Sequence, residues 1–127
     1  MARKTQRLSR GEWAVMTACW KLGRATARQV YEAMGEEERE YQTVKTLLDR
    51  IAAKGFLEVD KLGPLCLYTP RVRRATALRG AISEFMDTVL DHSLAPLFQH
   101  LAEREDIGDE ELAELRKLVE AAERKRR

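Results

Sequence analysis

The spacing of apolar residues changes at Gly55, and this change constrains the fold more than any other feature of the chain. Before it, apolar residues recur every three or four positions over 41–54, which is typical of a helix with one face on a core. They are Val44, Leu47, Leu48 and Ile51. After it, apolar and polar residues alternate over 56–60 and 66–70, on either side of a Gly-Pro turn at 61–65. This alternation predicts a β-hairpin directly after the helix.

Two shorter helices are predicted ahead of this segment, because each begins with a capping signature. Ser9 and Glu12 form a Ser-x-x-Glu capping box before a first apolar helical face. Thr26 and Gln29 repeat the signature before a second helix of about nine residues. A glycine follows the last apolar residue of each helix. Three helices and a hairpin are the layout of a winged helix, in which the third helix enters the DNA major groove.

The face of 41–54 opposite its apolar stripe is polar, and we interpret it as a base-reading surface. A solvated face is the ordinary alternative, but the winged-helix layout favours base contact. Its amide, hydroxyl and cationic groups can pair with adenine, pack on thymine methyl groups and reach guanine. The predicted base readers are Gln42, Thr43, Lys45, Thr46 and Arg50. Asp49 lies among them, where it can accept from cytosine, pair with Lys45 or repel phosphates.

Charge is divided unequally along the chain. The first 80 residues carry 16 Lys or Arg against 9 Asp or Glu, and the last 47 carry 7 against 12. A basic front half indicates a polyanionic partner, although chance clustering on a solvated surface gives the same counts. For each predicted phosphate contact, an exposed solubilising charge is the alternative. The predicted phosphate contacts are Arg3, Lys4, Arg7, Arg10, Arg28 and Lys61, and Thr26 is a further DNA-binding candidate.

The last third of the chain contains three more amphipathic helices and supplies the predicted dimer interface. The first covers 74–91, Ser93 is the predicted cap of a short second one with Pro96 in its first turn, and the third begins near Gly108. Their apolar faces must pack against a second copy or against the chain's own winged helix. We favour an intertwined dimer, because a twofold axis brings two recognition helices to half-sites about one turn of DNA apart. The predicted dimer contacts are Leu78, Ile82, Phe85, Val89, Leu97, Leu101, Leu112, Leu115 and Val119.

The predicted fold class is mainly α with a small β-hairpin, and 127 residues suffice for about one buried core. We expect a winged helix-turn-helix domain over 1–72 and a helical dimerisation domain over 73–127. No stretch approaches the roughly 20 apolar residues of a membrane span, and the basic N-terminus is followed by no secretory signal. We therefore expect a cytoplasmic protein.

Motifs that could carry enzyme or metal chemistry are missing from the sequence. Cys19 and Cys66 are too few and too far apart for a disulfide framework, so each is predicted to be a small buried apolar residue. His92 and His100 have no neighbours at metal-ligand spacing. We therefore predict no enzyme activity, no metal, no cofactor and no small-molecule substrate.

Several motifs together resemble the penicillinase-repressor family. They are Glu-Trp-x-Val-Met at 12–16, Ala-Thr-Ala-Arg-x-Val at 25–30, Tyr-x-Thr-Val-x-Thr-Leu-Leu-x-Arg-Ile-x-x-Lys-Gly at 41–55 and Tyr-Thr-Pro at 68–70, with Glu-Glu-Leu-x-Glu-Leu at 110–115. The resemblance covers nearly the whole chain. It implies a homodimeric winged-helix repressor that binds double-stranded DNA at a palindromic operator, often one that controls β-lactam resistance or related stress genes.

Three departures limit what this resemblance implies. The wing tip at 62–65 is apolar, so we expect no wing contact with DNA beyond Lys61. Inducible relatives are cut at an Asn-Phe pair by a membrane-bound sensor protease, but 97–101 reads Leu-Phe-Gln-His-Leu, so this partner is implied by the resemblance alone. Copper-sensing relatives carry a cysteine-rich tail, which this chain lacks.

An alternative function is a winged-helix module that binds proteins without touching DNA. Its binding would be insensitive to salt and to loss of Arg50, whereas DNA binding weakens steeply with salt. A hydrolase would need a catalytic constellation that the sequence does not contain.

Overall fold

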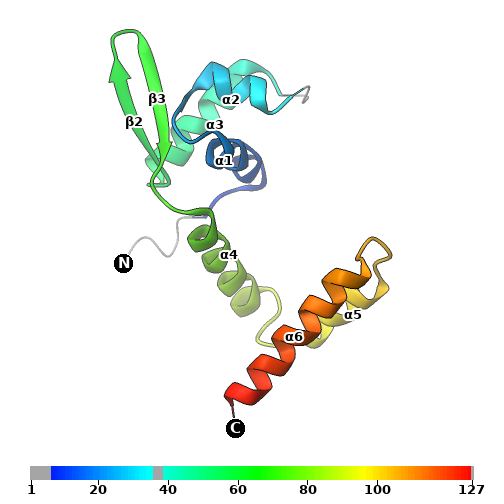
Figure 1. Cartoon of the computed structure of the whole chain (residues 1–127). Coiled ribbons are helices and arrows are strands. Elements are labelled where there is room, and N and C mark those ends of the chain that lie inside the picture. Colours follow the sequence, from blue (N-terminus) through cyan, green and yellow to red (C-terminus); the bar gives the residue numbers. More distant parts are fainter. Residues whose placement is uncertain (1–6, 36–38, 127) are drawn as a thin grey trace. The chain divides into compact units, whose positions relative to one another are not determined.

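A computed structural model describes residues 7–35 and 39–126 of the chain. In chain order the elements are α1 (Arg10–Leu22), β1 (Ala25–Thr26), α2 (Ala27–Ala33), α3 (Tyr41–Ala53), β2 (Leu57–Leu62), β3 (Leu65–Pro70), α4 (Arg74–Thr88), α5 (Ala95–Glu103) and α6 (Asp109–Lys125) (Figure 1). The fold is mainly helical with one small antiparallel sheet. This confirms the predicted fold class, a winged helix followed by C-terminal helices.

The chain divides into two compact units, Met1–Ile82 and Ser83–Arg127. The first contains α1 to α3, the sheet and the start of α4, and the second contains the rest of the helices. The expected domain boundary after residue 72 lies just before α4. The two compact units meet inside α4, between Ile82 and Ser83. The expected boundary stays a prediction. Over the described residues, no helix combines the length and the apolar character that crossing a membrane requires.

Both predicted capping boxes are present. The Ser9 hydroxyl accepts the Glu12 backbone N–H at 3.2 Å, and Glu12 Oε1 accepts the Ser9 N–H at 2.7 Å. Thr26 and Gln29 exchange the same two bonds at 3.1 and 2.9 Å. The second helix has seven residues rather than the expected nine or so, because Thr26 and Met34 are its capping residues; Gly35, with φ of 79°, follows as the predicted stop.

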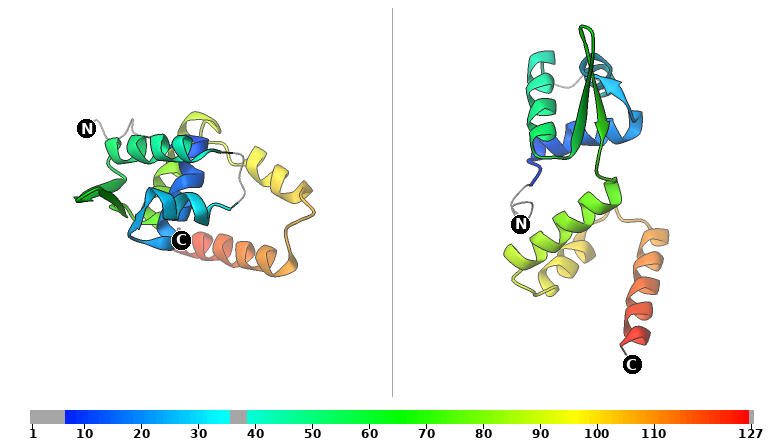
Figure 2. Two further views of the ribbon diagram at one scale, coloured as in Figure 1. Left: turned by 90° about the horizontal axis from the view of Figure 1, so that it is seen from above. Right: turned by 90° about the vertical axis from the view of Figure 1, so that its left-hand side faces the viewer.

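The hairpin of β2 and β3 is the wing of the fold. The strands pair antiparallel as far as Leu62 and Leu65, so Gly63 and Pro64 alone form the turn, and the predicted turn at 61–65 was too long. The short strand β1 was not predicted. It pairs with β3 and gives a sheet in the order β1-β3-β2, so β3 is the central strand. The wing extends past α1, α2 and α3 in Figure 1 and again in the right-hand view of Figure 2.

The hydrophobic core of the first unit lies between α1, α2, α3 and the sheet. The predicted apolar stripe of α3 is confirmed, since all four of its residues are buried. Tyr68 of the central strand and Cys19 of α1 are buried in the same core. Cys66 is only half-buried, so the prediction that both cysteines are buried is correct for Cys19 alone.

Helix α4 ends earlier than the spacing predicts. Its last residue is Thr88, whereas the sequence pattern continues to Asp91. Asp91 and His92 have positive φ angles of 54° and 66°, which a right-handed helix cannot include. The apolar repeat therefore runs past the end of the helix.

Helix α5 begins without a capping side chain, so the prediction for Ser93 was wrong. The Ser93 backbone N–H donates to the Leu90 oxygen in the turn after α4, and Leu94 takes the N-cap position. Pro96 does lie in the first turn of α5, where its missing N–H breaks no helical bond. Helix α6 starts after Gly108 as predicted.

Candidate nucleic-acid interface

The polar face of α3 lies at the surface, opposite the stripe that packs into the core. The exposed residues on it are Gln42, Thr43, Thr46, Asp49 and Arg50, and Lys45 is half-buried. The core therefore holds the helix by one face and leaves the other available to a partner. This is the arrangement of the helix that a winged helix inserts into the DNA major groove.

Lys45, Asp49 and Tyr68 form a network that joins the polar face of α3 to the wing, called here the Lys45–Asp49–Tyr68 network. Lys45 Nζ donates to Asp49 Oδ2 at 3.1 Å, and the Tyr68 hydroxyl donates to Asp49 Oδ1 at 2.9 Å. Lys45 Nζ also lies 5.9 Å from the centre of the Tyr68 ring. Of the three roles open to Asp49, the structure therefore shows pairing with Lys45.

Protonation keeps this network in one hydrogen-bonding state at neutral pH. Hydrogen bonding to Tyr68 and then to Asp49 raises the pKa of Lys45. Burial raises the pKa of the Tyr68 hydroxyl, which outweighs the opposing contact with Lys45. Lys45 is therefore a cation and Tyr68 a neutral donor.

Arg28 of α2 lies beside the start of α3. Its guanidinium carbon lies 4.6 Å from the centre of the Tyr41 ring and 5.6 Å from that of Tyr31. The two rings meet edge to face, with centres 5.8 Å apart. These contacts hold an exposed cation close to the N-terminal end of α3, where the helix dipole also favours an anion.

The remaining predicted contacts before the wing lie at the start of α1. Arg10 is its first residue, Arg7 precedes it, and both side chains are exposed. Arg3 and Lys4 lie outside the described residues. DNA contact by any of these cations stays a prediction.

Thr26 and Lys61 occupy quite different surroundings. The Thr26 hydroxyl oxygen accepts the Gln29 backbone N–H, so its cap of α2 accounts for the residue without DNA. Lys61 is exposed on β2, next to the wing tip. At that tip, Leu62 and Leu65 are both 53% exposed, in agreement with the apolar character predicted for it.

Two tyrosines of this site were not predicted as site residues. The alternation in β3 predicts only which face of the strand carries Tyr68, not that its hydroxyl reaches a carboxylate on α3. The contact of Tyr41 with Arg28 depends likewise on how α2 and α3 pack. The Tyr-x-Thr-Val and Tyr-Thr-Pro motifs contain both rings and are the signal that marks them.

Apolar side chains are exposed along the C-terminal helices α4, α5 and α6 and the segments that join them. No described residue of α5 or α6 is buried, and in α4 only Ala77 is. The exposed large apolar residues here are Ile82, Phe85, Val89, Leu94, Phe98, Leu112, Leu118 and Val119. Of the other predicted dimer contacts, the half-buried ones are Leu78, Leu97, Leu101 and Leu115. Exposed apolar side chains in this number favour a protein partner, and a dimer formed through them stays a prediction.

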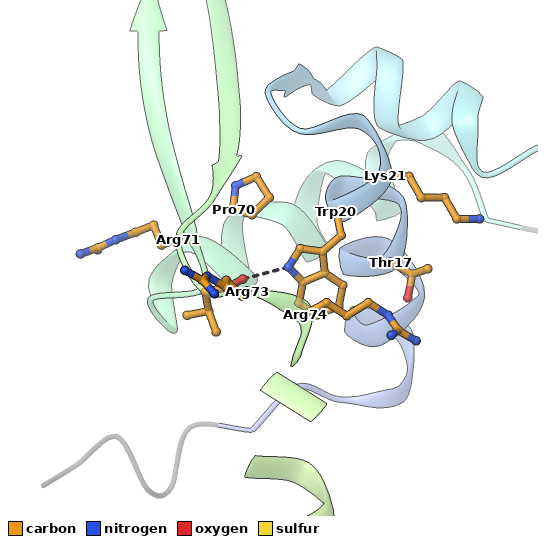
Figure 3. A pocket seen from close by; sticks show the side chains of 8 residues that line it. Thr17, Trp20, Lys21, Pro70, Arg71, Arg73 and Arg74 are labelled. Carbon is orange, nitrogen blue, oxygen red and sulfur yellow. Dashed lines mark hydrogen bonds between the residues drawn. The ribbon is translucent and has the colours of Figure 1, made fainter. Parts of the chain in front are cut away.

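A hollow lies between the end of α1 and the segment that leads from the wing into α4 (Figure 3). Trp20 lines it, and its indole N–H donates to the Val72 backbone oxygen at 2.8 Å. The Trp20 ring also lies 5.8 Å from that of Trp13, centre to centre. These contacts fix the path of the chain between the wing and the first turn of α4.

Among the described residues, no three His, Cys, Asp or Glu side chains gather as metal ligands would.

Comparison with known proteins assigns this arrangement to a family. The sequence model described as "Penicillinase repressor" matches residues 8–121. The chain is 27% identical to the methicillin resistance regulatory protein MecI of Mammaliicoccus sciuri, over 94% of this chain and 98% of that protein. It is 24% identical to the penicillinase repressor of Bacillus licheniformis, over 93% of each chain. An uncharacterized 16.5 kDa protein of Latilactobacillus sakei is 27% identical over 95% of this chain and 84% of its own length.

Proposed function

This chain belongs to the penicillinase repressor family, and from that premise we propose that it is a homodimeric repressor that binds an inverted-repeat operator through α3. The relatives are named as regulatory proteins and repressors rather than as enzymes, so transcriptional repression is the function of the family.

The observation that carries the proposal is the division of α3 into two faces. Val44, Leu48 and Ile51 are at most 1% exposed, so rotation of the helix about its axis would expose buried apolar side chains. The opposite face offers an amide, two hydroxyls and two cations, the groups that read base edges in the major groove. Cations around it neutralise phosphates and release counterions, which gives affinity without sequence preference.

The exposed apolar face of α4 to α6 supports the homodimer. Phe85 and Phe98 are exposed on two different helices, and burial of such side chains between two copies removes apolar area from water. A twofold dimer presents two α3 helices to the two halves of a palindrome. The proposed interface residues are those predicted from the helical spacing.

The names of the relatives suggest which genes are controlled. By analogy with regulators of methicillin resistance and penicillinase, we propose target genes for β-lactam resistance or a related stress response. In α5 the stretch 97–101 contains no Asn-Phe pair, so we propose no cut at such a pair. A membrane-bound sensor protease stays a prediction that rests on the family resemblance.

Selection of bound fragments from the source genome tests this function, followed by footprinting and fluorescence anisotropy at two salt concentrations. We expect one or a few promoter fragments with a protected inverted repeat, bound about 10³-fold or more tightly than unrelated DNA at physiological salt. We also expect affinity to fall steeply as salt rises. A chain that protects no palindrome near any promoter is not an operator-binding repressor. Salt-insensitive capture of a protein instead would support the protein-binding module.

A further inference from the structure

The Lys45–Asp49–Tyr68 network begins in the core and ends on the surface of α3. Tyr68 is 1% exposed, whereas the side chains of Asp49 and Lys45 are 56% and 31% exposed. A buried tyrosine whose hydroxyl reaches the edge of the core can hold a surface group in a fixed position through a hydrogen bond.

The buried end of the network is rigidly held. Tyr68 lies on the central strand of the sheet, where it pairs with Ala25 of β1 on one side and with Val59 of β2 on the other. Its ring packs in the core with the buried residues of α3. The Tyr68 hydroxyl is therefore fixed relative to the helix that carries Asp49.

Hydrogen bonds engage both carboxylate oxygens of Asp49. One carboxylate oxygen accepts from Tyr68 and the other from Lys45. The Lys45 ammonium has three N–H donors; Asp49 accepts one and the neighbouring Tyr68 hydroxyl takes at most one more, so at least one is available to an external acceptor. Guanine offers two acceptors in the major groove, N7 and O6.

A lysine on a protein surface ordinarily samples many rotamers and acts as a mobile point charge. Here the ammonium is held by a carboxylate one helical turn away, by the Tyr68 ring and, through Asp49, by the sheet. A cation with a fixed position discriminates between base pairs, whereas a mobile one chiefly neutralises phosphates.

We propose that Tyr68 and Asp49 are positioning residues for DNA recognition, which hold the Lys45 ammonium against a guanine edge and do not contact bases themselves. The inference rests on the proposed function, because it requires α3 to lie in the major groove. It assigns Asp49, a negative charge on a DNA-facing helix, a role that costs affinity and increases specificity. Loss of Asp49 should therefore increase the affinity for DNA in general and decrease the preference for the operator sequence.

The test measures dissociation constants of the full-length protein by fluorescence anisotropy. The duplexes are the selected operator, each single-base-pair variant of one half-site, and a scrambled sequence. We expect Lys45→Ala to lose about tenfold of its preference at one G·C pair. We expect Tyr68→Phe to lose about three- to fivefold at that pair, with unchanged binding to the scrambled duplex. Asp49→Asn should bind the scrambled duplex about threefold more tightly while losing preference at the same pair.

Two controls separate positioning from damage to the fold. Glu58→Gln alters an exposed carboxylate on β2 that lies outside the network, and it should keep wild-type preferences at every base pair. The double variant Lys45→Ala with Tyr68→Phe should match Lys45→Ala alone, because Tyr68 acts only through Lys45. If Tyr68→Phe unfolds, Asp49→Asn still tests the inference, because it alters only an exposed side chain.

The possible outcomes distinguish this inference from the proposed function. A wild-type protein that reads an operator while Asp49→Asn and Tyr68→Phe keep its preference at the Lys45-dependent pair overturns the inference alone. Loss of affinity for all duplexes in Asp49→Asn overturns it as well. A wild-type protein without preference for any sequence overturns the proposed function, and the inference with it.

Discussion

The Nζ atom of Lys54, at the end of α3, lies 2.6 Å from Oε1 of Glu12 in α1. The Glu12 side chain is 2% exposed and also accepts the Ser9 backbone N–H, so one carboxylate caps α1 and pairs with the C-terminal end of α3. Lys54 donates in addition to the Arg7 backbone oxygen at 2.6 Å. These bonds join the segment before α1 to the C-terminal end of α3.

Acid should weaken the fold through Glu12. Burial alone raises the pKa of Glu12, but the bonds from Lys54 and Ser9 outweigh it and lower the pKa below its ordinary value near 4.5. A carboxyl with a lowered pKa stabilises the fold above its unfolded-state value, and this contribution is lost as the pH falls through the folded-state value. We expect Glu12→Gln to lower the free energy of unfolding by about 1–2 kcal/mol at pH 7.

Urea unfolding from pH 7 down to pH 3 measures this effect. The difference between wild type and Glu12→Gln should shrink below pH 4.5, because the protonated wild-type side chain then resembles glutamine. Glu58→Gln, which alters an exposed carboxylate on β2, should leave the pH dependence unchanged. A constant difference between wild type and Glu12→Gln over this range would contradict the assignment.

The two cysteines should react at very different rates. Burial raises the pKa of the Cys19 thiol to about 12, so almost no thiolate forms there at pH 8, whereas Cys66 is half-buried on β3. With Ellman's reagent we expect one thiol to react in the native protein and the second only on unfolding. Cys66→Ser should abolish the first reaction, and Cys19→Ala should leave it intact. Rapid native labelling of the Cys66→Ser variant would contradict the buried position of Cys19.

Local signals account for most of the fold that could be predicted from the sequence. A capping box such as Ser9 and Glu12 depends on side chains three residues apart, and the stripe of α3 depends on one helical period. Strand β1 could not be predicted in this way, because two residues form a strand only when β3 pairs with them. Ser93 is a residue type that often caps helices, but the preceding turn places it one residue before the N-cap position of α5, which Leu94 occupies.

The exposed polar face of α3 was predicted, but of its contacts only the pairing of Asp49 with Lys45 was, as one of three alternatives. The polar face of α3 follows from the helical period, which places Gln42 and Arg50 opposite the core. The bond between Tyr68 and Asp49 depends on the distance between a strand and a helix, which no residue spacing encodes. The same is true of the Lys54 bond to Glu12, since the two residues belong to helices that meet only in the folded core.

Two cations near α3 should have different effects on DNA binding. Arg50 lies on the proposed base-reading face of α3, so we expect Arg50→Ala to cost about 1–3 kcal/mol at particular base pairs of the operator and to relax specificity there. Arg28 lies over Tyr41 at the helix start, so Arg28→Ala should weaken binding to all sequences similarly and reduce the salt slope by about 1. Anisotropy titrations with operator variants at several salt concentrations measure both effects.

The control for this pair is a cation on a distant helix. Arg116→Ala removes one exposed positive charge from α6 and should change neither specificity nor the salt slope. Equal loss of specificity in Arg28→Ala and Arg50→Ala would show that the two residues do not divide phosphate and base contacts in this way.

The apolar face of α4 should hold the dimer together. Phe85 is 44% exposed in the single chain and is a predicted dimer contact, so a charge there would be buried between two copies at high cost. We expect Phe85→Glu to raise the dimer dissociation constant about 30-fold or more, measured by analytical ultracentrifugation. Ser83→Glu adds the same charge at an exposed position of α4 that is not a predicted dimer contact, and it should remain dimeric. Binding to a full inverted repeat should weaken in Phe85→Glu, whereas binding to a single half-site should not, because each winged helix keeps its own α3. A wild-type chain that sediments as a monomer, or a Phe85→Glu variant that stays as dimeric as Ser83→Glu, would place the partner of this face elsewhere.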